Sequence, residues 1–136
     1  MKLLEGKVAL ITGASRGIGK AVALTFAKHG AAIAFTYLHA ADKAAQVEAE
    51  IAALGVKVKS YASDAASYAG AEALIQQVVA DFGTIDILVN NAGITRDGLV
   101  LRMSEQQWDE VMDSNLKSAF NAIHAVAPLM MKKRAG

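Results

Sequence analysis

Short apolar runs alternate along this chain with longer segments in which apolar residues recur every three or four positions. The run Val8–Ile11 and residues 31–37 predict strands that are buried on both faces, as in a parallel sheet. Residues 56–62 alternate apolar residues with lysine at their start, which favours a strand at the edge of the sheet with one wetter face. Residues 85–89 predict a fourth strand.

The segments with helical periodicity are residues 20–29, 42–54, 67–82, 104–111 and 115–133. Asp42 and Ser67 are placed to cap the second and third of these helices. Ser104 and Gln107 have the spacing of a capping box at the start of the fourth. Pro128 removes one backbone hydrogen bond from the last helix and can kink it.

The predicted order of elements is β-α-β-α-β-α-β-α-α. Strands that alternate with helices imply right-handed crossovers and a parallel sheet covered on both faces. An edge-like third strand fits the strand order 3-2-1-4, in which the winding direction changes between the first and fourth strands. Ligands bind at such a point, at the carboxyl ends of the strands. We therefore expect an α/β fold with a doubly wound parallel sheet and one domain over residues 1–136.

Three glycines, Gly13, Gly17 and Gly19, stand between the first strand and the first helix. A helix N-terminus offers unpaired N–H groups and a partial positive charge, and glycines let the backbone approach a pyrophosphate. A tight turn that binds nothing is the alternative. Residues 90–93, Asn-Asn-Ala-Gly, follow the fourth strand and reach the same crevice, which favours a phosphate site.

The spacing of these glycines excludes two common nucleotide-binding motifs. Five residues separate Gly13 from Gly19, whereas a P-loop has four before its Gly-Lys pair, and Ala21 cannot ligate magnesium. The close glycine pair comes last, so the loop is not G-x-G-x-x-G either. An NTPase is therefore disfavoured.

Composition indicates a globular protein and excludes several classes. The 136 residues are 54% hydrophobic and 20% charged, with a formal net charge of +1. This balance gives no sign of nucleic-acid or membrane-surface binding. The absence of cysteine excludes disulfides and thiolate chemistry. No apolar run reaches the ~20 residues of a membrane span, and the N-terminus lacks a signal-peptide core, so we expect a soluble, cytoplasmic protein.

The motif Thr-Gly-x-x-x-Gly-x-Gly at 12–19, with Asn-Asn-Ala-Gly at 90–93, resembles the short-chain dehydrogenase/reductase family. Residues 90–121, which include Gly-Ile-Thr-Arg-Asp at 93–97, are most similar to its bacterial 3-oxoacyl-[acyl-carrier-protein] reductases. The resemblance covers the whole chain and implies a Rossmann fold, a nicotinamide cofactor and a homotetramer. It also implies that strands five to seven of the family lie outside these residues, so that the dinucleotide-binding domain is truncated before strand five.

The resemblance assigns roles to individual residues. It implies cofactor contacts around the phosphates, at the adenine and beside the adenosine ribose, for Gly13, Ser15, Arg16, Gly17, Ile18, Gly19, Asp64, Ala65, Asn91, Ala92 and Gly93. Thr12 is expected to tie the glycine turn to the loop after the fourth strand. Asp64 could instead cap a turn. Asn115 matches the asparagine that holds a water in the family's proton relay; the alternative is a helix-cap or kink residue. No metal site is expected.

The choice between NAD and NADP depends on the end of the second strand. An acid there would bond the 2′-hydroxyl of NAD and repel the 2′-phosphate of NADP. Residues 36–39 are Thr-Tyr-Leu-His, and Asp42 is the first acid that follows. Arg16 can pair bidentately with a phosphate. These residues favour NADP, although Leu38 stands where related reductases often carry a small hydroxyl residue.

The catalytic serine, tyrosine and lysine that the resemblance implies are not found in this chain. The tyrosine should be followed four residues later by lysine, but Tyr37, Tyr61 and Tyr68 are followed by Ala41, Ala65 and Glu72. We expect the parent protein to reduce a 3-oxoacyl thioester with NADPH in fatty acid biosynthesis, and the 136 residues alone to be inactive. The alternatives are a non-catalytic dinucleotide-binding module and a family member that acts on another carbonyl.

Two groups of residues on the last helix indicate possible contacts with other protein chains. Phe120, Ile123, Ala127 and Met130 form an apolar stripe, and in the family this helix packs against another subunit. Lys132, Lys133 and Arg134 form a basic cluster. This cluster either interacts with the helix dipole and solvent or docks the acidic acyl carrier protein that the resemblance implies.

Overall fold

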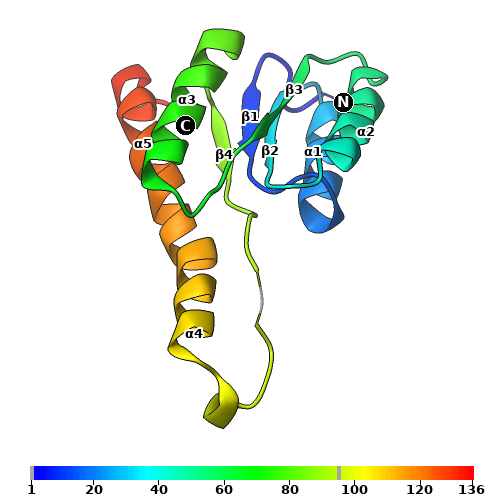
Figure 1. The fold of residues 1–136 in the computed structure, drawn as a ribbon. Helices are drawn as coiled ribbons and strands as arrows, with labels where there is room; N and C mark the ends of the chain where they lie inside the picture. Colours follow the sequence, from blue (N-terminus) through cyan, green and yellow to red (C-terminus); the bar gives the residue numbers. More distant parts are fainter. Residues whose placement is uncertain (1, 95) are drawn as a thin grey trace.

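A computed structural model describes residues 2–94 and 96–136; Met1, and Thr95 of the 93–97 stretch, lie outside the described residues. Its centre is a four-stranded parallel sheet in the order β3-β2-β1-β4 (Figure 1), as predicted. The strands are β1 (Val8–Ile11), β2 (Ala32–Tyr37), β3 (Val58–Ala62) and β4 (Ile87–Val89). Helices α1 (Gly17–Lys28) and α2 (Ala41–Ala52) cover one face, and α3 (Tyr68–Phe82) and α5 (Ser118–Lys133) the other (Figure 1).

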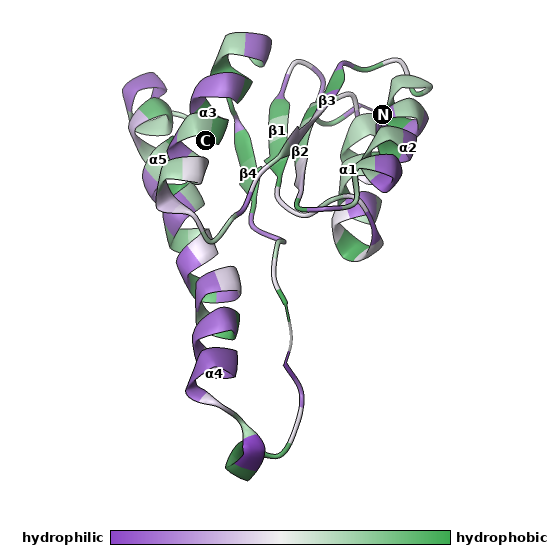
Figure 2. Cartoon of the chain, viewed as in Figure 1, coloured by the Kyte–Doolittle hydropathy of each residue, from purple (hydrophilic) through white to green (hydrophobic). Residues whose placement is uncertain are grey.

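The sheet is apolar on both faces because its strand residues point alternately into two cores. Ala9 and Ile11 pack with α1 and α2, whereas Leu10 packs with α3 and α5. All three side chains are fully buried. Figure 2 shows the contrast between the green strand β1 and the largely purple helix α4 (Glu105–Met112). The alternation explains why a continuous apolar run, rather than a period of two, marks the inner strands.

Several predicted boundaries move. α1 begins at Gly17 rather than at residue 20, and β3 and β4 each begin two residues later than predicted. The expected cap at Asp42 is wrong, because the N-cap of α2 is Ala40 and makes no side-chain bond. Asp42 lies in the first turn, where its negative charge interacts favourably with the helix dipole. The cap at Ser67 is confirmed, since its side chain accepts from the N–H of Gly70 at 3.0 Å.

The last two predicted helices form one continuous rod. α4 continues through a π-helical turn, Asp113–Lys117, into α5, and the rod extends well beyond the sheet (Figure 1). The predicted break near Asn115 is therefore wrong, and α5 also continues through Pro128. The capping box is confirmed by reciprocal bonds between Ser104 and Gln107, of 2.9 and 3.1 Å. The short 3-10 helix Val100–Arg102 before it was not predicted.

The C-terminal end of α5 is fastened to the beginning of β4. Lys133 Nζ lies 2.6 Å from Asp86 Oδ1 and donates to Thr84 Oγ1 at 2.8 Å. Burial opposes the charge on Asp86, but the bonds from Lys133 and from the N–H of Val8 outweigh it and lower the pKa of this carboxyl. Lys133, one of the three residues of the predicted basic cluster, is thus bonded within the fold. Across residues 2–94 and 96–136, no helix combines the length and apolar character needed to span a membrane.

Candidate functional site

The carboxyl ends of β1 and β4 lie side by side, and a threonine joins the loops that follow them. Thr12, the residue after β1, is 4% exposed. Its Oγ1 accepts the N–H groups of Asn91 at 3.0 Å and Ala92 at 2.9 Å. The predicted tie between the glycine turn and the loop after β4 is therefore confirmed.

A second set of contacts explains two of the glycines. Asn91 Nδ2 donates to the carbonyl oxygen of Gly13 at 2.8 Å. Gly13 has φ +69°, and a Cβ on it would lie 3.0 Å from Ala92 Cα. A Cβ on Gly19 would collide with the carbonyl oxygen of Gly13 and lie 2.5 Å from Asn91 Nδ2. Both glycines are thus required by close packing within the protein, a reason that spacing alone did not indicate.

β2 also contributes to the glycine turn, through a residue that sequence reasoning missed. Thr36 is 2% exposed, and its Oγ1 accepts the N–H of Gly13 at 3.0 Å. Its carbonyl accepts the N–H of Ala14, also at 3.0 Å. A hydroxyl in an otherwise apolar buried strand was the available signal, because a buried hydroxyl needs a hydrogen-bond partner.

The N-terminus of α1 is open to an anion. Its N-cap, Arg16, has extended backbone and makes no side-chain cap bond, and the first turn contains no acid. Gly17 has φ +61°, and no atom lies within 4 Å of the position of a Cβ. Ser15 is half-buried, while Arg16 and Ile18 are exposed. Unpaired first-turn N–H groups, the helix dipole and a guanidinium form a donor set that matches phosphate.

The loop between β3 and α3 forms another side of the crevice. Asp64 Oδ1 accepts the N–H of Ala66 at 3.0 Å. The side chain of Asp64 therefore caps a turn, which was the alternative to cofactor contact. The carbonyl of Ala65 accepts a bond of 3.2 Å from Asn121 Nδ2 on α5. Contact of Asp64 or Ala65 with adenine remains a prediction.

Asn115 lies in the π-helical turn and contacts the loop after β4. Its Nδ2 donates to the carbonyl oxygens of Ile94 and Val111, each at 2.8 Å. A Cβ on Gly93 would collide with the Asn115 side chain. The asparagine therefore braces the loop against the α4–α5 rod. Single π-helical turns often occur at functional sites, and the relay role of Asn115 stays a prediction.

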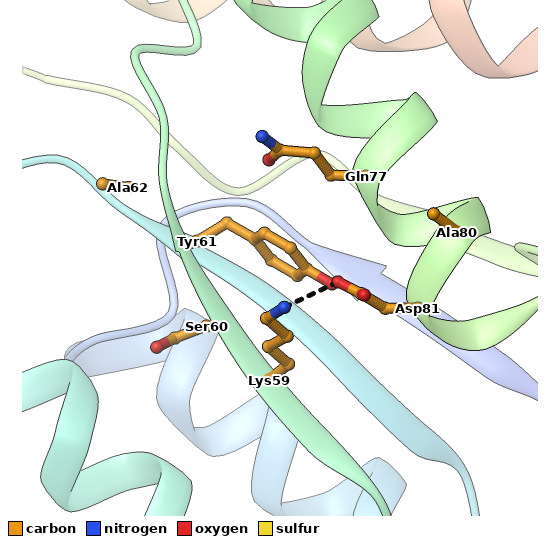
Figure 3. A pocket seen from close by; sticks show the side chains of 7 residues that line it. All are labelled: Lys59, Ser60, Tyr61, Ala62, Gln77, Ala80 and Asp81. Atoms are coloured by element: carbon orange, nitrogen blue, oxygen red, sulfur yellow. Dashed lines mark hydrogen bonds and ion pairs between the residues drawn. The ribbon is translucent and has the colours of Figure 1, made fainter.

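A separate hollow of about 470 Å³ lies along the edge strand β3 and the C-terminal half of α3 (Figure 3). Tyr61 donates to Asp81 Oδ2 at 2.6 Å, and Lys59 Nζ lies 2.8 Å from the same oxygen. Burial, then the bond to Asp81, raises the pKa of Tyr61, and the bond from Lys59 lowers the pKa of Asp81. No residue of the crevice lines this hollow, and its charges neutralise one another.

The fold and the crevice define an α/β domain of the dinucleotide-binding class, with an open helix N-terminus at the point where the winding of the sheet reverses. Comparison with known proteins narrows this class. The chain belongs to the short chain dehydrogenase family, whose sequence model matches residues 7–136. The predicted family is therefore confirmed.

Curated relatives carry a more specific name. The chain is 48% identical over 130 residues to the 3-oxoacyl-[acyl-carrier-protein] reductase FabG of Staphylococcus epidermidis, covering 96% of this chain and 53% of that protein. It is 44% identical over 132 residues to FabG of Escherichia coli, covering 97% of this chain and 52% of that protein. The chain thus spans about half the length of these relatives.

Solved structures agree on the fold. NAD+-bound xylitol dehydrogenase matches with a TM-score of 0.94 at 34% identity, over 99% of this chain and 52% of that one. A short-chain dehydrogenase/reductase of Serratia marcescens matches with a TM-score of 0.89 at 39% identity, over 93% of this chain and 51% of that one. The Rossmann-type architecture predicted from the sequence is confirmed.

Proposed function

We propose that this chain forms the cofactor-binding half of an NADPH-dependent 3-oxoacyl-[acyl-carrier-protein] reductase. The observation that carries the proposal is the N-terminus of α1, which has no side-chain cap. It lies beside the loop after β4, whose N–H groups donate to Thr12, the residue that follows β1. The identity of 44–48% to relatives of that name supports the choice of substrate. When bound, the nicotinamide supplies a hydride to the carbonyl carbon.

The residues that would hold the cofactor fall into three groups. The first-turn amides of α1, with Ser15 and Arg16, would bind its phosphates. Asp64 and Ala65 would flank the adenine, and residues 91–93 the adenosine ribose. The bonds made by the loops after β3 and β4 support this arrangement, because they fix both loops relative to the rest of the domain.

We infer NADP rather than NAD from the charges at the rim of the crevice. Arg16 is exposed at the glycine loop. Leu38, the residue that follows β2, is exposed and uncharged. No acid follows β2 before Asp42, which lies inside α2. A guanidinium without a competing carboxylate favours a 2′-phosphate.

Titration of NADPH and NADH against the unmodified chain and its Arg16→Ala variant tests this inference. A charge-assisted bond contributes about 1.5–3 kcal/mol, so we expect the Kd for NADPH to rise roughly 10- to 100-fold and that for NADH to change far less. Lys20→Ala is the control, because Lys20 lies on the same helix but pairs with Glu50 at 3.1 Å. Equal losses for both cofactors in Arg16→Ala would contradict the 2′-phosphate role.

We further propose that reduction requires residues outside this chain. None of Tyr37, Tyr61 and Tyr68 is followed four residues later by lysine, which also favours a non-catalytic dinucleotide-binding module as the second candidate. A chain of verified 136-residue mass should bind NADPH but not oxidise it with an acetoacetyl thioester. Measured turnover would contradict this proposal.

We propose that the complete protein is a homotetramer. We also propose that it binds acyl carrier protein through exposed basic residues. Phe120 and Ile123 are more than half exposed on α5, as an unpartnered subunit interface requires. Lys132 and Arg134 remain exposed at its end, whereas Lys133 is engaged with Asp86. Arg134→Glu should weaken reduction of carrier-linked substrate more than that of a free thioester; equal effects would exclude docking there.

A further inference from the structure

Asn121 is a deeply buried polar side chain of α5, whose other buried residues are Ser118, Ala122 and Val126. It is 1% exposed, and its Nδ2 donates to the carbonyl of Ala65 at 3.2 Å. Its Oδ1 is buried and has no hydrogen-bond partner among the residues that the structure describes. A buried amide with half of its bonding unmet is costly compared with an apolar residue of similar size. Its presence therefore indicates a task other than packing.

The α4–α5 rod bonds both to the loop after β3 and to the loop after β4. Asn115 holds the loop after β4 through the carbonyl of Ile94, and Asn121 holds the loop after β3 through the carbonyl of Ala65. The two asparagines are six positions apart, which corresponds to about 9 Å along a helix axis. One rigid element thus sets the spacing between the two loops.

The carbonyl of Ala65, in the loop after β3, accepts the hydrogen bond from Asn121, and the neighbouring residues bond elsewhere. Asp64 bonds within the loop, to the N–H groups of Ala66 and Ser67. Tyr68, the first residue of α3, bonds to Nδ1 of His124 on α5 at 3.0 Å, but this contact is exposed and lies beyond the loop. Ser63, at the start of the loop, donates its N–H to the carbonyl of Tyr37 on β2 at 3.0 Å, so that end of the loop is tied to the sheet. The buried amide of Asn121 is the contact that ties the carbonyl of Ala65 to α5.

We propose that Asn121 is a positioning residue for the adenine end of the cofactor. By holding the carbonyl of Ala65, it fixes the Asp64–Ala65 segment in the position from which that segment flanks the adenine. Asn121 does not itself touch the cofactor. The inference rests on the proposed function, because it needs a dinucleotide in the crevice.

The test compares Asn121→Leu, which keeps the branched shape of the side chain and removes the amide, with a matched variant of the same helix. Val126→Ala is that control, because Val126 is 3% exposed and packs in the core shared with α3, at Leu74 and Val78. The probe is adenosine 2′,5′-bisphosphate, titrated by calorimetry beside NADPH. Hydrogen exchange of the Ala66 and Ser67 amides reports the loop directly, and thermal unfolding reports stability.

For Asn121→Leu we expect a roughly tenfold weaker affinity for the bisphosphate and for NADPH, faster exchange at Ala66 and Ser67, and an unchanged or higher Tm. Val126→Ala should lower the Tm and leave affinity and loop exchange unchanged. If Asn121→Leu does not fold, Asn121→Ser gives the same comparison. Unchanged affinity in the Asn121 variant would overturn the inference, whether or not exchange accelerates, as would an equal loss of affinity in Val126→Ala. Failure of the unmodified chain to bind either probe would instead overturn the proposed cofactor site.

Discussion

Replacing Gly19 by alanine is a direct test of how the glycine turn is built. The added Cβ would overlap the carbonyl oxygen of Gly13 and lie 2.5 Å from Asn91 Nδ2 and 3.0 Å from Ala14 Cα. Overpacking of this kind costs about 1–3 kcal/mol. Displacing Asn91 from its bond to Gly13 adds about 1 kcal/mol, and the better helix propensity of alanine returns about 0.5–1. We expect a net loss of about 1–3.5 kcal/mol.

Thermal and urea unfolding, followed by far-UV circular dichroism, measure this loss. For a domain of this size it corresponds to a fall in Tm of roughly 3–18 °C. Gly17→Ala is the matched control, because a Cβ there meets no atom within 4 Å and only the positive φ of 61° is penalised, by about 1–2 kcal/mol. If Gly19→Ala unfolds within about 0.5 kcal/mol of the unmodified chain, Gly19 is not required by the packing described here.

Three further substitutions test other parts of the molecule. Thr12→Val leaves the N–H groups of two loop residues without their acceptor and should cost about 2–4 kcal/mol in urea unfolding, whereas Thr12→Ser should cost about 1 or less. Because the pKa of Asp86 is lowered in the folded state, its carboxylate stabilises the fold above about pH 4, and this effect is lost as the pH falls through the folded pKa. Asp86→Asn should therefore reduce the loss of unfolding free energy at acid pH. An unchanged loss would show that the contact with Lys133 does not cause the acid sensitivity. Phe120→Glu should reduce self-association in sedimentation velocity, and an unmodified chain that is monomeric at all concentrations would contradict an interface at the exposed stripe of α5.

The features predicted correctly from sequence are those whose cause is local or repeated along the chain. Strand order followed from the difference between continuous apolar runs and the lysine-containing β3, because burial on both faces tolerates no charge. The caps at Ser67 and Ser104 followed from hydroxyls that reach amides only three residues away. Asp42 misled the same reasoning, because a favourable charge in the first turn resembles a cap in sequence.

The features that were missed depend on residues distant in sequence. Thr36 bonds to Gly13 across 23 residues, and Asn121 to Ala65 across 56. The π-helical turn at 113–117 replaces a predicted break, and the side chain of Asn115 within it bonds to the loop after β4. No periodicity marks such contacts, since each depends on which strand and helix ends the fold brings together.

The backbone N–H groups around the crevice fall into two sets, one bonded within the protein and one at the open N-terminus of α1. The N–H groups of Gly13 and Ala14 are bonded to Thr36, and those of Asn91 and Ala92 to Thr12. These bonds set the shape of the crevice but leave its ligand-facing donors to the first turn of α1, where no side chain or acid competes. A dipole and backbone amides do not distinguish one phosphate-bearing cofactor from another. We therefore predict that discrimination between NAD and NADP depends on exposed side chains at the rim, such as Arg16 and Leu38.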